Sequence, residues 1–371
     1  MTTYIMTYIA SSLSAFCYSK SKNRNISFLF KIMTFLILFL PAALRYNVGA
    51  DYAHYVKYIS QAFARGKYDL YEPAWIPLLY CMDRKNISLH FFFVVSSFVT
   101  LFCFFTLTNK KTLFVAVPVY FSFAYLESYC LVRQGVAVAV FLVAIKFYLE
   151  RKSFLCIIFA FISVLFHKSA AVLCLMLFCV SVFNIKFSRW RNVIFFMLIF
   201  VLLKKLNLAQ LLISKTIGLT PYAYYANHLK FSQKTEMGTG LGFLLRAVII
   251  FIIVIACSNK KRNCCKISNH KDGVEIHERA YYLVCAFMFF QLAFVIMATQ
   301  VYIFNRLPNL LPPFYGFAVS IMAESKFKYR KIALMIVVFF FSVFLVANLR
   351  EYTSDKNSGL GIVPYQSIFS R

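Results

Sequence analysis

The sequence predicts an all-α, polytopic integral membrane protein, and three observations support this. Hydrophobic residues make up 61% of the 371 residues, and charged residues only 14%. Apolar runs of about 15–20 residues recur along the chain, and runs of this length can cross the hydrocarbon core of a bilayer. The runs are continuously apolar, whereas the strands of a membrane β-barrel alternate polar and apolar residues.

Lysine and arginine clusters orient these runs, because cytoplasmic loops carry an excess of positive charge. Lys20 and Arg24 place the first turn inside, and later clusters alternate with the runs to give roughly twelve spans with both termini outside. The predicted spans are Met1–Tyr18, Ile26–Leu44, His90–Thr108, Leu113–Leu126, Arg133–Leu149, Phe154–Phe166, Ala170–Phe183, Val193–Leu206, Leu241–Cys257, Ala280–Ala298, Leu307–Ala323 and Ile332–Leu349.

The remaining segments are loops of a single membrane domain, residues 1–371. We expect outside loops at about 45–89 and 207–240, and a basic cytoplasmic loop at about 258–279. The amphipathic stretch Glu72–Tyr80 favours an interfacial or re-entrant piece. The N-terminal run lacks the basic start of a signal peptide, so we expect it to remain as a span. The two short runs on either side of His167 are the most ambiguous, because merging them would invert every later span.

The net charge of +27 does not indicate a nucleic-acid partner. Most basic residues lie in short clusters between apolar runs, where topology and anionic lipid headgroups account for them. Most of the eleven cysteines lie within apolar runs, as small core residues do. Only Cys264 and Cys265, with His270 and His277, hint at zinc, and their spacing is weak. No Asp-x-Asp pair occurs, so we expect neither a metal nor a cofactor.

The most informative polar segment is Arg45–Tyr55, which directly follows an apolar run. Polar groups at a membrane boundary are costly to desolvate and often mark a site. With the predicted topology, further polar residues reach the same outer face, which suggests that an anionic substrate is handled there. These residues are Arg45, Asp51, Glu72, Glu127, Arg133, Gln134, His167 and Arg306.

Each candidate also has a structural alternative. Arg45 and Arg306 fit helix-end anchors whose charged heads reach the interface. Asp51 fits a helix N-cap or an arginine partner, and His167 an interfacial histidine. Glu127 and Arg133 fit a structural ion pair. The tyrosines and Trp75 fit interfacial aromatics.

The order of these motifs resembles the EpsG family of polysaccharide polymerases, which look like the Wzy-type polymerases of O-antigens, capsules and exopolysaccharides. The run Arg-x-x-Val-Gly-x-Asp-Tyr-x-x-Tyr at 45–55 resembles the opening signature of the family, although Ala50 stands where Thr or Ser is common. The other motifs follow in order over most of the chain: Glu72-Pro73, Val132-Arg133-Gln134, Phe166-His167-Lys168-Ser169-Ala170, Asn305-Arg306 and Pro364-Tyr365.

The resemblance implies a multi-span fold related to the C-type membrane glycosyltransferases, in the bacterial cytoplasmic (inner) membrane. It implies an active site on the periplasmic or extracellular side and lipid-linked oligosaccharides on undecaprenyl pyrophosphate as substrates. A chain-length regulator is a partner by resemblance only. The loop 207–240 carries no motif that can be transferred, and we expect it to determine sugar specificity.

The residues and the resemblance together predict one reaction. A hydroxyl of the next lipid-linked unit attacks the anomeric carbon of the growing glycan, and lipid pyrophosphate leaves. Guanidinium groups match pyrophosphate oxygens, so Arg45, Arg133 and Arg306, with Lys168, are the candidates for the leaving group. Asp51 is the first candidate for the base, followed by His167 and Glu127. The remaining predicted substrate-binding residues are Gln134, Tyr52, Tyr55 and Glu72.

Two other functions remain open from the sequence. A flippase for lipid-linked sugars would need internal symmetry and polar residues at the midplane, but only Lys31 and Arg246 lie deep within predicted spans and no repeat is visible. A membrane acyltransferase that modifies glycans would use His167 as its base, but the predicted inside face lacks a matching acid–histidine pair.

Overall fold

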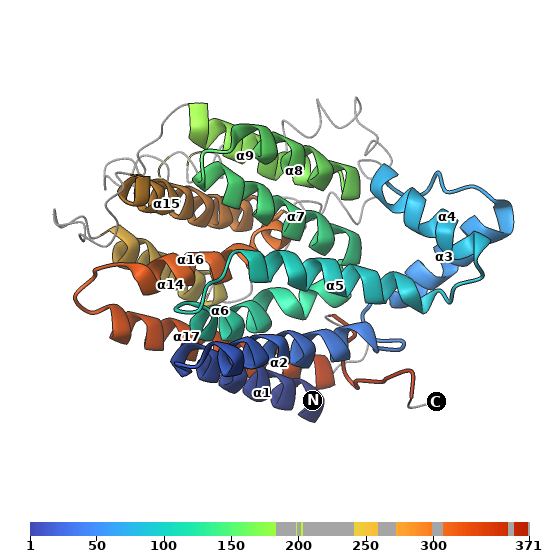
Figure 1. Cartoon of the computed structure of the whole chain (residues 1–371), viewed down its shortest axis with the longest axis horizontal. Helices are drawn as coiled ribbons and strands as arrows, with labels where there is room; N and C mark the ends of the chain where they lie inside the picture. Colours follow the sequence, from blue (N-terminus) through green and yellow to red (C-terminus); the bar gives the residue numbers. More distant parts are fainter. Residues whose placement is uncertain are drawn as a thin grey trace.

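The computed structural model describes residues 1–182, 198, 202, 241–258, 272–298, 307–354 and 360–369, and over these residues the chain is helical without strands. Apart from α3 and α4, the helices lie side by side along roughly one common direction (Figure 1). Their bounds are α1 Thr2–Lys20, α2 Arg24–Ala43, α3 Tyr52–Arg65, α4 Ile76–Arg84, α5 His90–Thr106, α6 Leu113–Tyr120, α7 Val132–Leu149, α8 Ser153–Phe166, α9 Ala170–Val182, α14 Leu241–Ser258, α15 Asp272–Ala298, α16 Pro312–Glu324 and α17 Arg330–Ser354.

Four of the described helical stretches are long and apolar enough to cross a membrane: Arg24–Ala43, Val132–Leu149, Arg279–Ala298 and Arg330–Arg350. Five shorter apolar stretches accompany them, and α1 forms as predicted without belonging to either group. All the predicted spans that fall on described residues are therefore helical. Of the predicted span Val193–Leu206 the structure describes only Leu198 and Leu202, both helical, and the loop 207–240 lies outside the described residues.

Some boundaries differ from the sequence prediction. The helix α15 begins at Asp272, inside the predicted loop 258–279, and α17 continues to Ser354 into the predicted tail. His167 adopts an extended backbone conformation that separates α8 from α9. The two short runs on either side of His167 are therefore two helices.

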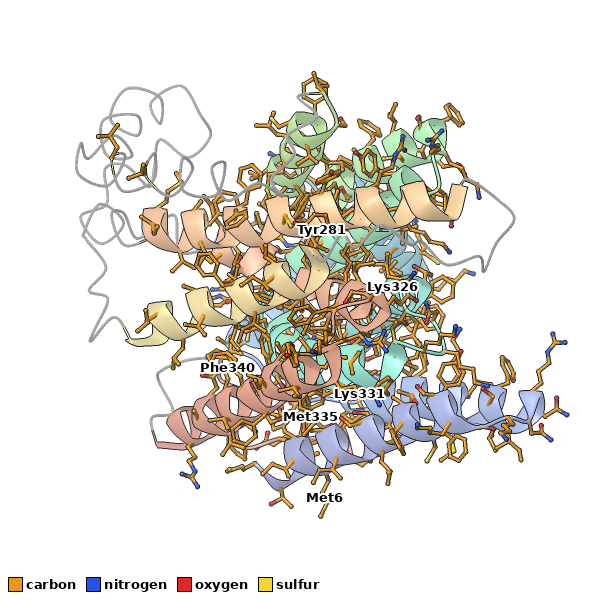
Figure 2. All side chains as sticks on the ribbon, turned by 90° about the vertical axis from the view of Figure 1, so that its left-hand side faces the viewer. Met6, Tyr281, Lys326, Lys331, Met335 and Phe340 are labelled. Carbon is orange, nitrogen blue, oxygen red and sulfur yellow. The ribbon has the colours of Figure 1, made fainter. Side chains whose placement is uncertain are left out.

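Burial separates the central helices from the peripheral ones. In α7 and α15, 72% of the apolar stretch is buried, compared with 28% in α2 and 33% in α17. Large apolar side chains remain exposed on the outer helices, and Figure 2 shows Met6 pointing away from the bundle. In water such a surface would be unfavourable, whereas lipid chains solvate it.

Three turns with basic residues lie together at one end of the bundle. Lys110 Nζ donates to the carbonyl of Ser21 at 2.5 Å, and Asn109 Nδ2 donates to Glu324 Oε1 at 2.6 Å. These two bonds connect three turns that are far apart in the sequence. Figure 2 views this end, with Lys326 and Lys331 near the turn between α16 and α17. The helices α3 and α4 project from the opposite end, where the C-terminus also lies (Figure 1).

Candidate functional site

A carboxylate, a guanidinium and an imidazole meet at the end of the bundle that carries α3 and α4. Glu72 Oε2 accepts from Arg133 Nη1 at 2.7 Å, and Glu72 Oε1 lies 2.6 Å from His167 Nδ1. We call these three residues the Glu72 cluster. The Glu72 side chain is 9% exposed, whereas those of Arg133 and His167 are 29% and 26% exposed. The carboxylate therefore lies beneath a guanidinium and an imidazole that both remain accessible.

The local sequence explains how Glu72 reaches this position. Glu72 is extended and is followed by a 3₁₀ turn, Pro73–Trp75, in which proline needs no hydrogen-bond partner for its nitrogen. Trp75 is 1% exposed and donates from Nε1 to the carbonyl of Phe166 at 3.0 Å. This bond fixes the segment against the end of α8, directly before His167. Trp75 is thus a buried anchor, and the alternative of an interfacial aromatic is wrong for it.

The surroundings of Glu72 favour its ionised form. Burial alone would raise the pKa of this carboxyl, but the hydrogen bond to His167 and the charge of Arg133 together hold the pKa below its usual value. An ionised carboxylate only accepts hydrogen bonds, so Nδ1 of His167 is the donor. Nε2 of the imidazole is then directed away from Glu72 and is available to a substrate.

Two tyrosines frame Arg133. The guanidinium carbon lies 5.3 Å from the ring centre of Tyr71 and 5.8 Å from that of Tyr55, within cation–π range. Burial raises the pKa of both phenols, so both remain neutral. The buried Arg133 Nε and Tyr71 hydroxyl find no hydrogen-bond partner among the described residues. The cluster therefore keeps unused hydrogen-bonding capacity.

Arg45 does not join the Glu72 cluster. It is 1% exposed, and its Nη1 donates to the carbonyl of Ala42 at 2.6 Å and to Ser97 Oγ at 3.3 Å. Its guanidinium carbon lies 4.5 Å and 4.9 Å from the ring centres of Tyr129 and Phe93. An arginine enclosed in this way is not an anchor that reaches the interface, so the snorkelling alternative is wrong for Arg45.

Residues 360–369, which we call the C-terminal segment, pair with the loop 44–51. Gly49 N donates to the carbonyl of Gly361 at 3.0 Å, and Ala50 N donates to the carbonyl of Leu360 at 2.8 Å. Arg45 and Ser367 form an antiparallel bridge. Gly49 has a φ of +109°, and a Cβ built on it would lie 2.5 Å from the carbonyl oxygen of Tyr129. Only glycine fits this turn, as its place in the signature predicts.

Asp51 occupies the N-cap position of α3, but its side chain makes no capping hydrogen bond. Its carboxylate has no ion-pair partner among the described residues. The backbone carbonyl of Asp51 accepts from Tyr55 N at 3.0 Å. Asp51 therefore starts the helix that carries Tyr55 to Arg133, while its carboxylate stays available.

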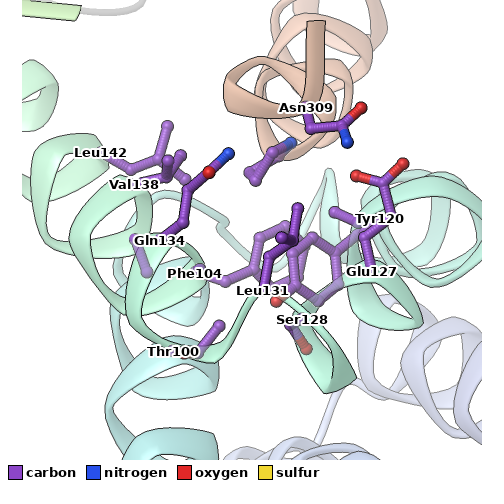
Figure 3. Close-up of a pocket in the computed structure, with 14 residues that line it drawn as sticks. Thr100, Phe104, Tyr120, Glu127, Ser128, Leu131, Gln134, Val138, Leu142 and Asn309 are labelled. Atoms are coloured by element: carbon purple, nitrogen blue, oxygen red, sulfur yellow. The ribbon is translucent and has the colours of Figure 1, made fainter. Parts of the chain in front are cut away.

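Glu127 lies apart from the Glu72 cluster. The α6 helix passes into a π-helical turn, Phe121–Tyr125, and then a 3₁₀ turn that begins at Glu127. Glu127 lines a cavity of about 20 Å³ together with Gln134 and Asn309 (Figure 3). Burial raises the pKa of Glu127 to about 8, against the opposing charge of Arg246. Because Arg133 pairs with Glu72, the predicted alternative of a Glu127–Arg133 ion pair is wrong.

The other predicted residues are placed as follows. Tyr52 is 6% exposed and stacks on Phe93 at 4.4 Å. Lys168 is exposed beside His167. Arg306, Cys264 and Cys265 lie outside the described residues. Within the described part of the chain, no three His, Cys, Asp or Glu residues are grouped so that they could hold a metal ion.

Sequence reasoning missed Tyr71 and Asn309. Tyr71 directly precedes Glu72, and Asn309 follows Arg306 by three positions. Each lies close in the sequence to a predicted site residue, and this proximity was the only signal that could have identified it.

The apolar helices, with a polar cluster at one end of them, define a helical membrane protein with a polar site. The chain belongs to the EpsG family, whose model matches residues 28–367, nearly its whole length. This family is associated with polysaccharide polymerases and glycosyltransferase-like membrane proteins. No curated protein and no solved structure matches the chain.

Proposed function

We propose that this protein is a polysaccharide polymerase that transfers a growing glycan from undecaprenyl pyrophosphate to the next lipid-linked repeat unit. The Glu72 cluster is the observation that carries the proposal. It presents an arginine and a histidine, both accessible and held by one buried carboxylate, at one end of the apolar helices. Membership of the EpsG family supports the same reaction class.

In the proposed reaction, an acceptor hydroxyl oxygen forms a bond to the anomeric carbon of the donor sugar. The bond from that carbon to the pyrophosphate oxygen breaks, and its electron pair leaves with the lipid pyrophosphate. Arg133 and the Nε2–H of protonated His167 stabilise the negative charge that develops on the leaving group, with Lys168 nearby. Glu72 touches neither reacting atom in this scheme and positions both cationic side chains.

Arg45 has a different part in this proposal. Its guanidinium is enclosed by Tyr129 and Phe93, so we assign it to bracing the loop that carries Asp51. Arg306 stays a proposed pyrophosphate ligand on the strength of the family motif alone. Asp51, His167 and Glu127 remain the proposed candidates for the base. His167 can take this role only as a neutral imidazole, and Arg133 and Lys168 would then act on the leaving group without it.

The membrane arrangement completes the proposal. We place roughly twelve crossings in a bacterial cytoplasmic membrane, in a fold related to the C-type glycosyltransferases. The end that carries the Glu72 cluster faces the periplasm or cell exterior, because three turns with basic residues lie together at the opposite end. A metal-independent mechanism and a chain-length regulator as partner belong to the same proposal.

The reaction can be tested with purified protein in lipid nanodiscs. The substrate is the lipid-linked repeat unit extracted from a host strain that lacks this gene. We expect the wild-type protein to produce a ladder of glycan lengths on lipid, and Arg133→Ala to produce almost none. A wild-type protein that only moves the lipid-linked unit across a bilayer would instead support the flippase alternative.

The glycan profile of the null strain separates the three candidate functions. A polymerase null leaves single repeat units on the cell surface, whereas a flippase null leaves none. A null of a glycan acyltransferase leaves full-length chains that lack the acyl group.

A further inference from the structure

The cavity beside Glu127 is lined by two polar side-chain groups that form no hydrogen bond with another described residue. The Glu127 carboxylate receives no hydrogen bond from the described residues. Gln134 is 5% exposed, and its Nε2 is buried without a partner there. Buried polar groups are nearly always satisfied, so each exception calls for an explanation. The buried Nε2 of Gln134 is such an exception. The half-buried Glu127 carboxylate lines the same cavity, which suggests that something binds between the two groups.

The two groups complement each other. An ionised carboxylate accepts hydrogen bonds and an amide NH₂ donates them, so together they match a hydroxyl, which does both. In Figure 3, Gln134 and Glu127 approach the cavity from different sides, and Asn309 lies near the Glu127 carboxylate. The volume of about 20 Å³ holds about one water-sized group. A single hydroxyl fits, whereas a whole sugar ring does not.

The remaining lining of the cavity is mostly apolar, with Phe104, Leu131 and Val138 among its residues. Burial of this kind strengthens hydrogen bonds inside the cavity relative to those in water. Arg133 and Gln134 are consecutive residues of α7. Contacts to the leaving group and contacts at this cavity would therefore lie on neighbouring faces of one helical turn.

We propose that Glu127, Gln134 and Asn309 form the subsite for the attacking hydroxyl of the acceptor sugar, and that Glu127 is its base. This inference rests on the proposed polymerase function. Gln134 Nε2 donates to the hydroxyl oxygen, and Glu127 accepts the hydroxyl proton as that oxygen bonds to the anomeric carbon. The electron pair of the broken bond leaves with lipid pyrophosphate, which the Glu72 cluster stabilises.

The charged and titratable groups around Glu127 are compatible with this role. Arg246 of α14 is the cation that acts on the carboxylate, and the Arg246 guanidinium packs over Phe123 at 5.5 Å. Tyr120 of α6 lines the cavity, and the thiol of Cys130 lies close enough for the Glu127 charge to act on it. A base with a pKa of about 8 combines a useful deprotonated fraction with a strong affinity for the proton near neutral pH.

The test compares Glu127→Gln with two matched controls in the nanodisc assay, using the extracted lipid-linked repeat unit as probe. Glu324→Gln changes a glutamate that instead accepts a hydrogen bond from Asn109. Gln291→Leu is the control for Gln134→Leu. Gln291 is also buried, at 1% exposed, and has no partner among the described residues, but it does not line this cavity.

We expect Glu127→Gln to slow chain growth about 100-fold or more, with unchanged binding of the lipid-linked unit. Gln134→Leu should slow it about tenfold, and both controls should retain normal rates. The wild-type rate should rise with pH up to about 8 and then level, and Glu127→Gln should lose this rise. The Asp83→Asn variant should retain the rise of the rate with pH.

The outcomes separate this inference from the proposed function. If the wild-type protein polymerises, Arg133→Ala does not, and Glu127→Gln keeps the wild-type rate and pH profile, then the subsite is wrong and the polymerase function stands. If Asp51→Asn alone removes the rise with pH, the base is Asp51. If the wild-type protein makes no polymer, the proposed function fails, and the subsite fails with it.

Discussion

Glu72 lies 2.6 Å from His167 through Oε1 and Nδ1, although 95 residues separate them in the chain. This contact joins the segment before α4 to the break between α8 and α9. The same carboxylate holds Arg133 with its other oxygen. One side chain thus positions both the Arg133 guanidinium and the His167 imidazole, and its removal should affect both.

Glu72→Gln should slow glycan polymerisation about 100-fold. A carboxamide has only one accepting oxygen, so it cannot accept from both Arg133 and His167, and the two side chains shift. The comparison is the rate of ladder formation at equal protein amounts in membranes, with Glu150→Gln as control. Glu150 pairs with Lys152 in an exposed turn. Equal rates for Glu72→Gln and wild type would show that the cluster does not position substrate-binding groups.

Arg133→Lys should be almost as inactive as Arg133→Ala, about 100-fold below wild type. Lysine keeps the charge but loses the planar fork that can bind Glu72 and an oxyanion together. It also loses much of the stacking on Tyr71. A lysine variant with more than half the wild-type rate would indicate that Arg133 supplies charge alone.

The Glu72 cluster should make the protein less stable in acid. Because the folded-state pKa of Glu72 is lowered, the unfolded chain binds its proton at a higher pH than the folded protein does. The stabilisation is complete above the unfolded pKa, about 4.3, and is lost as pH falls through the folded-state pKa. The Tm in detergent should therefore fall below about pH 4 more steeply for wild type than for Glu72→Gln. Parallel Tm curves would contradict this assignment.

Gly49→Ala should destabilise the protein more than Gly66→Ala. Both glycines have positive φ, +109° and +61°, but a Cβ at Gly66 meets nothing within 4 Å. The φ penalty for alanine is about 1–2 kcal/mol, and at Gly49 the 2.5 Å approach to Tyr129 adds to it. The Tm values of the two purified variants provide the comparison. A smaller loss at Gly49 would mean that the loop can move away from Tyr129.

The helices were readily predicted because a bilayer imposes a simple rule. Apolar runs of sufficient length become helices, since no other local structure satisfies all their backbone groups in lipid. The positions at which the helices begin and end were less predictable. The sequence around Asp272 is polar, and its helical conformation depends on extension from the apolar stretch that begins near Arg279.

The members of the Glu72 cluster were nominated from the sequence, but the partnership among them was not. Glu127 is nearer to Arg133 in the chain than Glu72 is, so sequence distance favoured the wrong ion pair. In the folded protein Arg133 pairs with Glu72 instead, because the Trp75 anchor brings Glu72 to the end of α8. Contacts between distant segments are not encoded in local spacing.

Arg45 shows a second limit of sequence reasoning. A basic residue after an apolar run normally reaches the interface, and its sequence neighbours do not reveal what covers it. The C-terminal segment pairs with the Arg45 loop, and Tyr365 donates from its hydroxyl to the carbonyl of Pro41 at 3.0 Å. Only the tertiary arrangement shows that Arg45 is enclosed.

The pairing of the C-terminal segment with the loop 44–51 also has a consequence for biosynthesis. Tyr4 donates to the carbonyl of Ile362, a partner 358 residues later in the chain. The loop 44–51 is therefore synthesised early. Its hydrogen bonds to the C-terminal segment can form only after Leu360 and Gly361 have been translated. A chain that stops before residue 360 would carry every member of the Glu72 cluster and still lack the C-terminal segment that holds Gly49 and Ala50 in place.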